Sequence, residues 1–283
     1  MTSFHHRAGV WDLAGRARVV GILNLTPDSF FDGGRYVEPA VALSRAEAMA
    51  SEGADAIDVG GQSTRPGGKA LSAEEEWARL SPVLASLVKH VPLPFSVDTY
   101  FGEVARRALD VGVAMVNDVS GLGVDPGLAD VTAKAGAGLV LMHSHGAPDA
   151  LHAPREYGDV AEEVAMHLAR RASLAESRGV SRDRIALDPG IGFSKRAEQS
   201  LEALAGIPRL LSLGYPVYVG VSRKSFLGAV TGLPVEDRLP AGLAASVSAY
   251  HLGARIFRTH DVKETVEALR VAERVAQTGS VRA

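Results

Sequence analysis

Polar and charged residues recur at the ends of short apolar segments throughout this chain, and no other feature constrains its fold as strongly. Asp98 follows Phe-Ser-Val, Asn117 follows Ala-Met-Val, Asp188 follows Ile-Ala-Leu and His143 follows Gly-Leu-Val-Leu-Met. In a (β/α)8 barrel, the residues that perform the chemistry lie at the C-terminal ends of successive strands. The pattern therefore predicts an α/β fold of this kind.

Eight short apolar segments predict strands of a parallel sheet, because such strands are buried on both faces. They span residues 18–24, 55–59, 94–97, 113–117, 138–142, 184–188, 216–221 and 254–258. The amphipathic segments between them predict helices near 39–53, 73–90, 101–111, 126–135, 157–178, 196–212, 239–252 and 261–277. We expect a (β/α)8 TIM barrel in a single domain over residues 1–283, with residues 1–16 as an N-terminal extension.

The same alternation of strands and helices fits a doubly wound open sheet. The count of eight units, with polar residues after nearly every strand, favours the barrel. No G-x-G-x-x-G or P-loop sequence opens a predicted helix, so the common nucleotide-binding folds lack support. The segment 144–157 is expected to be a mobile loop, and His5 and His6 are expected to lie in a frayed terminus.

Composition excludes several classes of function. The chain has 30 basic and 33 acidic residues, so it carries no global basic charge for nucleic acid. It has no cysteine, which excludes disulfides, thiolate metal sites and a cysteine nucleophile. No segment approaches the roughly 20 apolar residues of a membrane span. We expect a cytoplasmic protein that binds neither nucleic acid nor membrane.

Two loops are rich in glycine and hydroxyl side chains. The loop at 21–34, GILNLTPDSFFDGG, contains Asn24 and Asp32, whose hard oxygen atoms suit a magnesium ion bridging a phosphate. Its Phe30 is a candidate to close over a flat substrate. The second loop, STRPGG, places Arg65 beside backbone amides that suit an anion. The alternative for both is an ordinary βα turn with a helix-capping residue.

Three strand ends carry acid or amide side chains, namely Asp98, Asn117 and Asp188. Each could cap the helix that follows. Together they predict a ligand rich in N–H donors, because a buried carboxylate is costly unless it is paired. A carboxylate that accepts two parallel N–H bonds from a guanidine-like heterocycle edge makes a strong, directional contact.

Basic residues cluster after the last two strands, in SRKS (222–225) and RTH (258–260). Singly, such residues are usually solvated charges. Two clusters from neighbouring units predict the phosphate site that barrels build there, with Arg223, Lys224, Arg258 and His260 as its candidate residues. The sequence therefore predicts a pocket with one wall for a polar heterocycle and another for a phosphate or pyrophosphate.

Other catalytic and metal sites have weak support. His143 and His145 flank a serine, but no carboxylate accompanies them at zinc-ligand spacing, so a zinc site is not favoured. No Ser-His-Asp arrangement can be identified, because Ser63 and Ser225 have no assigned base.

The motifs themselves resemble those of the dihydropteroate synthase family. GILNLTPDSFFDGG, DVGGQSTRPGG, SVDT, NDVSG, LDPGIGFSK, SRKSF and RTHDV occur in the family's order over about residues 19–263. The resemblance implies a magnesium-dependent transferase of bacterial folate synthesis, a target of sulfonamides and a homodimer. It would condense 6-hydroxymethyl-7,8-dihydropterin pyrophosphate with 4-aminobenzoate, giving 7,8-dihydropteroate and pyrophosphate by a dissociative substitution.

The resemblance also assigns residues to subsites. It implies a pterin pocket of Asp98, Asn117, Met142, Asp188, Phe193 and Lys224. It implies a pyrophosphate site of Asn24, Arg65, Arg258 and His260, with Asn24 and Asp32 at the metal. It implies an aminobenzoate pocket of Phe30, Thr64, Arg65, Pro66 and Ser225, bordered by Phe193 and Lys224. The residues closest to the chemistry would be Asn24, Arg65, Lys224, Arg258 and His260.

The sequence departs from the family pattern at two positions. Gln62 stands where glutamate is usual, and Phe31 replaces a usual serine. Two rival functions remain at this point. A methyltetrahydrofolate methyltransferase would share the pterin wall but would have no use for the basic clusters. A non-catalytic pterin-binding paralogue would explain the two departures.

Overall fold

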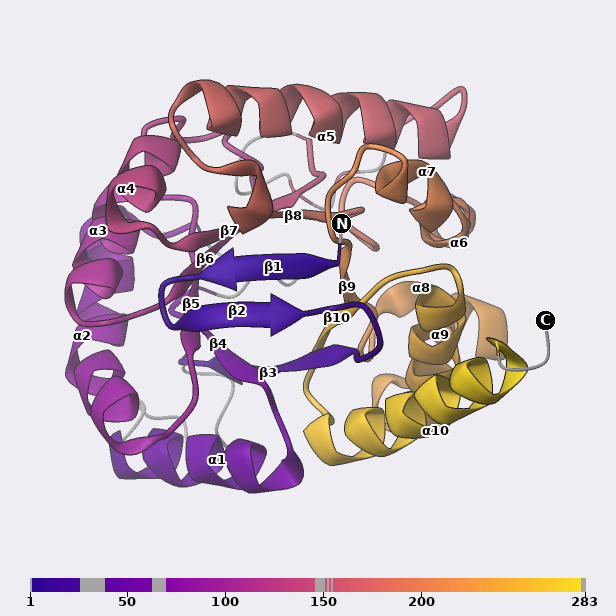
Figure 1. Cartoon of the computed structure of the whole chain (residues 1–283), viewed down its shortest axis with the longest axis horizontal. Helices are drawn as coiled ribbons and strands as arrows, with labels where there is room; N and C mark the ends of the chain where they lie inside the picture. Colours follow the sequence, from indigo (N-terminus) through magenta and orange to yellow (C-terminus); the bar gives the residue numbers. More distant parts are fainter. Residues whose placement is uncertain are drawn as a thin grey trace.

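The computed structural model describes residues 2–25, 39–62, 70–145, 151, 153 and 155–280. At its centre, eight parallel strands run in the order β8-β7-β6-β5-β4-β3-β10-β9. They are β3 (Arg18–Asn24), β4 (Ala56–Gly60), β5 (Phe95–Asp98), β6 (Met115–Asp118), β7 (Gly138–Met142), β8 (Ile185–Asp188), β9 (Tyr218–Gly220) and β10 (Ile256–Thr259). A bridge between Leu187 and Val217 joins β8 to β9 and closes the sheet into a barrel (Figure 1).

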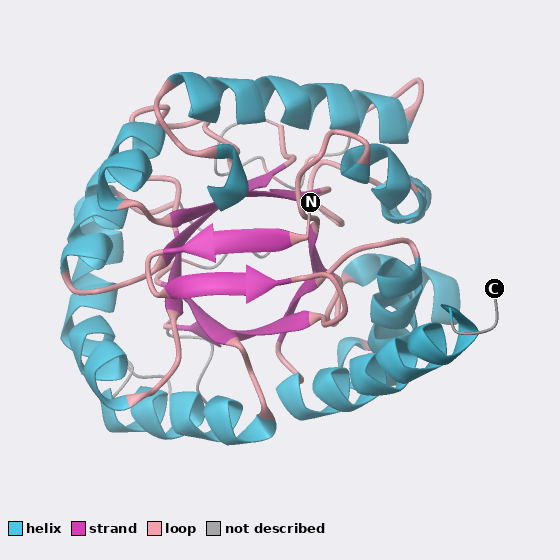
Figure 2. Cartoon of the chain, viewed as in Figure 1, coloured by secondary structure: helices cyan, strands magenta, loops and turns pink. Residues whose placement is uncertain are grey.

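Helices surround the barrel, as Figure 2 shows. They are α1 (Pro39–Glu52), α2 (Ala73–His90), α3 (Gly102–Asp110), α4 (Leu128–Ala135), α5 (Val160–Ser177), α6 (Ala197–Ala205), α7 (Ile207–Leu211), α8 (Ser225–Thr231), α9 (Leu239–His251) and α10 (Val262–Ser280). Two short 3-10 segments, η3 (Arg182–Arg184) and η4 (Val235–Asp237), complete the set. The start of α2 is fixed by a capping box between Ser72 and Glu75, which satisfies two backbone N–H groups left free at a helix start.

The predicted (β/α)8 barrel is confirmed. Every predicted strand is present, and no strand end differs from its predicted position by more than two residues. Two helical details differ. The predicted helix at 196–212 is divided into α6 and α7 at Gly206, where Pro208 follows and cannot continue the hydrogen-bonding of the preceding turn. The segment after β9, for which the sequence predicted no helix, contains the additional helix α8, which begins at Ser225.

The N-terminal residues form an antiparallel hairpin of β1 (Ser3–His6) and β2 (Gly9–Asp12). The hairpin lies across one end of the barrel in Figure 1. Phe4 and Trp11 pack in one buried cluster with barrel residues such as Val20 and Tyr218. The expectation that His5 and His6 lie in a frayed terminus is therefore wrong: both are in β1, and burial lowers the pKa of His6 to about 4.

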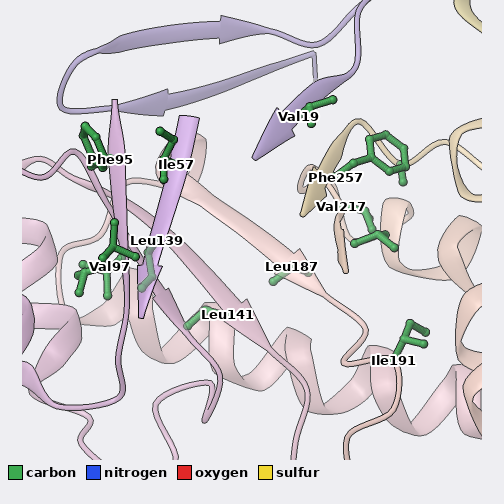
Figure 3. Packing of buried hydrophobic residues seen from close by; sticks show 14 of the residues in the cluster. Val19, Ile57, Phe95, Val97, Leu139, Leu141, Leu187, Ile191, Val217 and Phe257 are labelled. Carbon is green, nitrogen blue, oxygen red and sulfur yellow. The ribbon is translucent and has the colours of Figure 1, made fainter. Parts of the chain in front are cut away.

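Alternation along the strands decides which side chains reach the barrel interior. Ile57, Val97 and Leu187 belong to the main apolar cluster, whose members pack around the strands and beneath the helices (Figure 3). Successive strand side chains point to opposite faces, so the neighbours of these residues, Asp58 and Asp98 among them, face the interior. The register pairs Asp98 with Asn117 across β5 and β6, so both side chains lie on the same face. The inward-facing side chains at the C-terminal strand ends are therefore polar, whereas the outward-facing side chains beneath the helices are apolar.

Among the described residues, no helix is both long enough and apolar enough to cross a membrane.

Candidate active site

A cavity of about 730 Å³ opens where the parallel strands end. Strands β5, β6, β8 and β10 contribute Asp98, Asn117, Asp188 and Arg258 to its wall. The loops and helix that follow β8 and β9 contribute further side chains, including Phe193 and Lys224. This is the end of a parallel barrel where functional residues are found.

The structure brings together every predicted site residue that lies within the described ranges. Those residues are Asn24, Asp98, Asn117, Met142, Asp188, Phe193, Arg223, Lys224, Ser225, Arg258 and His260, and all of them line the cavity. Five predicted residues lie outside the described residues. They are Phe30, Asp32, Thr64, Arg65 and Pro66.

Arg258 forms the electrostatic centre of the cavity. Its Nε donates to Asp58 Oδ2 at 2.7 Å, and its Nη2 donates to Asp98 Oδ2 at 2.9 Å. Asn117 Nδ2 donates to the same Asp58 oxygen at 3.0 Å. Burial raises the pKa of Asp98, Arg258 opposes that rise, and neighbouring carboxylates add to it. The Arg258 guanidinium therefore pairs with two buried carboxylates. Through Asp98 it contacts the wall predicted to bind a heterocycle, while Arg258 itself belongs to the wall predicted to bind an anion.

Asp58 is the functional residue that sequence reasoning missed. It is fully buried in β4, and its Oδ2 anchors both Arg258 and Asn117. Its other oxygen, Oδ1, is buried without a hydrogen-bond partner among the described residues. A signal was available, because an aspartate inside the apolar run Ala-Ile-Asp-Val must be paired if it is buried.

Asp188 ends β8, and Lys224 follows β9, the strand between β8 and β10 in the closed sheet. Asp188 Oδ1 accepts a hydrogen bond from Gly190 N at 2.7 Å, and burial raises its pKa while Lys224 opposes that rise. Gly190 has a φ of 65°, and a Cβ there would collide with the carbonyl oxygen of His143, so this tight turn needs glycine. The turn fixes the position of the carboxylate that closes β8.

Lys224 is aimed at the apolar part of the same wall. Its Nζ donates to Ile191 O and lies 4.7 Å from the centroid of the Phe193 ring. Burial lowers its pKa to about 8, and Asp188 opposes that change. A flat heterocycle can lie on the Phe193 ring while its polar edge meets the carboxylates and the lysine.

His260 and its neighbours form the basic end of the cavity. Ser222 Oγ lies 3.1 Å from His260 Nδ1, which orients the imidazole. Arg223, in a left-handed conformation with φ of 57°, makes a bidentate ion pair with Asp261. Arg223, Lys224, Arg258 and His260 all line the cavity, so this end carries the basic groups that the sequence predicts for an anionic ligand.

Gln62 also has a defined contact. Tyr100 OH donates to Gln62 Oε1 at 2.9 Å, so the residue that departs from the family pattern is held at the end of β4 by a hydrogen bond. An amide oxygen accepts this bond as a carboxylate would.

Comparisons with known proteins agree with the geometry. A model of the pterin-binding enzyme family matches residues 20–260. A dihydropteroate synthase from Synechocystis sp. is 41% identical over 93% of this chain and 92% of its own length. The Escherichia coli K12 dihydropteroate synthase is 40% identical, with 90% of each chain covered.

Solved structures give the same result. Dihydropteroate synthase from Xanthomonas albilineans with 4-aminobenzoic acid has a TM-score of 0.90 and 42% identity, covering 97% of this chain and 98% of that one. The same enzyme in complex with 7,8-dihydropteroate has a TM-score of 0.84 and 40% identity, covering 94% and 96%. A Yersinia pestis dihydropteroate synthase in a sulfonamide drug complex has a TM-score of 0.90 and 36% identity, covering 97% and 99%.

Proposed function

Because the chain belongs to the dihydropteroate synthase family of pterin-binding enzymes, we propose that it joins 6-hydroxymethyl-7,8-dihydropterin pyrophosphate to 4-aminobenzoate. The products are 7,8-dihydropteroate and pyrophosphate. One observation carries the proposal: Asp98, Asn117 and Asp188 share a single cavity with Arg258 and His260. A substrate with an N–H-rich ring at one end and a pyrophosphate at the other matches both walls.

The pterin ring is proposed to lie against Phe193, with its N–H groups donating to Asp98 and Asp188. Both carboxylates are buried, so hydrogen bonds from the ligand replace the water that they lack. Lys224 Nζ, beside Phe193, is placed to donate to an acceptor atom on the ring edge. These contacts fix the orientation of the ring and therefore the position of its exocyclic methylene.

The pyrophosphate is proposed to lie against Arg258 and His260. When bound, a magnesium ion supplies positive charge that stabilises the leaving pyrophosphate. Asn24 fits such an ion, because it closes β3 at the cavity wall and offers a hard amide oxygen. Asp32, the other proposed ligand, lies outside the described residues.

The substitution is proposed to be dissociative. The bond from the methylene carbon to the pyrophosphate oxygen breaks first, and the electron pair leaves with the pyrophosphate toward Arg258. The resulting cation on the pterin is stabilised by the fixed negative charges of Asp98 and Asp188, which need no reorganisation during the reaction. The neutral amine of 4-aminobenzoate then forms the C–N bond and loses its proton to water, so no strong general base is required.

Pyrophosphate release is the direct test of this function. The purified protein is assayed with magnesium, the dihydropterin pyrophosphate and 4-aminobenzoate, and with each omitted in turn. We expect release and formation of dihydropteroate only when all three are present. Pterin binding by calorimetry without any release would contradict the proposed turnover. Release that persists after chelation of divalent ions would contradict the role of magnesium.

We also propose that the protein forms a homodimer through α9 and α10, which pack side by side. Val271 and Val275 lie one helical turn apart on α10 and are 65% and 61% exposed, which leaves an apolar strip on its surface. A Val271→Glu, Val275→Glu variant is expected to sediment as a monomer while the unchanged protein sediments as a dimer. Met166→Glu, at an exposed apolar residue of α5, is the control. Equal sedimentation of the double variant and the unchanged protein would refute this interface.

A further inference from the structure

Three histidines from different parts of the chain converge beside the end of β7. His143 follows β7 directly, His145 lies two residues later, and His167 lies on α5. One ring nitrogen from each lies within 4.8 Å of the others. The ring centroids are 4.8 to 5.0 Å apart, with the planes 70° to 88° from one another. None of the three lines the cavity of the proposed reaction.

His143 has a buried ring nitrogen that the described residues leave unused. Its Nδ1 lies 2.8 Å from Lys195 Nζ. Its Nε2 is buried and has no hydrogen-bond partner among the residues that the structure describes. A buried polar atom without a partner is rare in native proteins and calls for an explanation such as an ion.

The three converging rings and the buried, unpartnered Nε2 of His143 are the geometric basis of a metal site. Burial lowers the pKa of His143, of His145 and of His167, the last to about 4, so burial favours the neutral imidazole. A neutral imidazole offers a lone pair to a metal ion.

We propose that His143, His145 and His167 bind a first-row transition-metal ion, with zinc as the expected occupant. Three imidazoles supply three ligands, and water supplies the fourth. Zinc–nitrogen bonds of about 2.0–2.1 Å require the three nitrogens to approach to roughly 3.4 Å. His145 and His167 are partly exposed, so their side chains can rotate and bring their ring nitrogens closer to that of the buried His143.

The ligand atoms and their neighbours determine which metals fit. Lys195 contacts His143, and Arg171 Nε donates to His167 Nε2 through a long bond of 3.3 Å that the ion would displace if it took this nitrogen. No carboxylate belongs to the described ligand set. A hard ion such as magnesium, which depends on charged or neutral oxygen ligands, is therefore disfavoured. Zinc, copper and nickel bind well to imidazole.

The test is zinc binding by the whole purified protein, measured by competition with a chromophoric zinc indicator. We expect one zinc per chain that excess magnesium does not displace. His145→Ala and His167→Ala should each weaken binding by about 100-fold or more, because loss of an outer-sphere partner alone costs 10- to 100-fold. His90→Ala and His251→Ala, at exposed histidines outside the cluster, should leave the affinity unchanged.

Cobalt gives a second, spectroscopic readout that begins with the unchanged protein. The unchanged protein loaded with Co2+ should show the visible absorption of a four- or five-coordinate site, and His167→Ala should abolish it. Zinc affinity that survives in the His145→Ala, His167→Ala double variant would overturn the proposal. So would affinity that is lost in His260→Ala instead, because that result would place the ion in the reaction cavity.

Discussion

An Arg258→Met variant is expected to lose both stability and turnover. Arg258 donates to Asp58 and to Asp98, and Asp58 is fully buried. Removing one partner from a buried ion pair costs about 3–5 kcal/mol, because a buried charge is left without compensation. Pyrophosphate release should fall by about 100-fold or more, the usual effect of removing a donor aimed at developing negative charge.

Two further variants separate the causes of this loss. Adding Asp58→Asn to Arg258→Met removes one of the two carboxylate charges left without compensation, so part of the stability should return while turnover stays low. Lys134→Met, at an exposed position of α4, should leave both properties unchanged. Urea unfolding measures stability, and the pyrophosphate assay measures turnover. An unfolding free energy for Arg258→Met within about 0.5 kcal/mol of the unchanged protein, the range of ordinary surface substitutions, would refute this account of Arg258.

The barrel could be predicted from the sequence because each of its strands obeys the same rule. Strands covered on both faces must be apolar throughout, and functional side chains must follow them. The polar ends of β5, β6 and β8 identified Asp98, Asn117 and Asp188 on this ground, and all three line the cavity. A polar residue that directly follows an apolar strand can be recognised from its neighbours in the sequence, so these three site residues could be predicted.

The role of Asp58 depends on contacts that no local pattern contains. Its partner Arg258 is 200 positions away, and the two meet only because β10, β3 and β4 are successive strands of the closed sheet. His167 escaped notice for a similar reason. It lies on a long helix, and only the packing of α5 beside β7 brings it to His143. In the sequence, His143 and His145 are only a pair with no carboxylate at zinc-ligand spacing, so a zinc site is not favoured there.

The ends of the fold were also harder to predict than its centre. The hairpin of β1 and β2 contains four-residue strands, and its burial depends on the open barrel end that Phe4 and Trp11 cover. The division between α6 and α7 depends on Gly206, which packs closely against Ala161 of α5. In both places tertiary packing decides the local structure, whereas the barrel strands follow their own apolar pattern.

Asp98→Asn is expected to weaken binding of 6-hydroxymethyl-7,8-dihydropterin by at least about tenfold, or roughly 1.4 kcal/mol. A carboxylate can accept two parallel N–H bonds, whereas an amide presents one acceptor and one donor, and the donor opposes a ligand N–H. The Asp98 side chain is buried and lines the cavity, so water cannot compensate for the mismatch. Titration calorimetry with the pterin alcohol, which has no leaving group, measures this binding step without turnover.

Asp118→Asn is the matched control, because Asp118 is equally buried and closes the neighbouring strand without lining the cavity. Its carboxylate accepts hydrogen bonds from Ser120 and Leu122, so this substitution is expected to reduce stability. Pterin affinity in the control should stay close to that of the unchanged protein. If both variants lose affinity equally, the loss reflects general destabilisation of the barrel. If Asp98→Asn alone loses it, the carboxylate of Asp98 acts on the ligand directly.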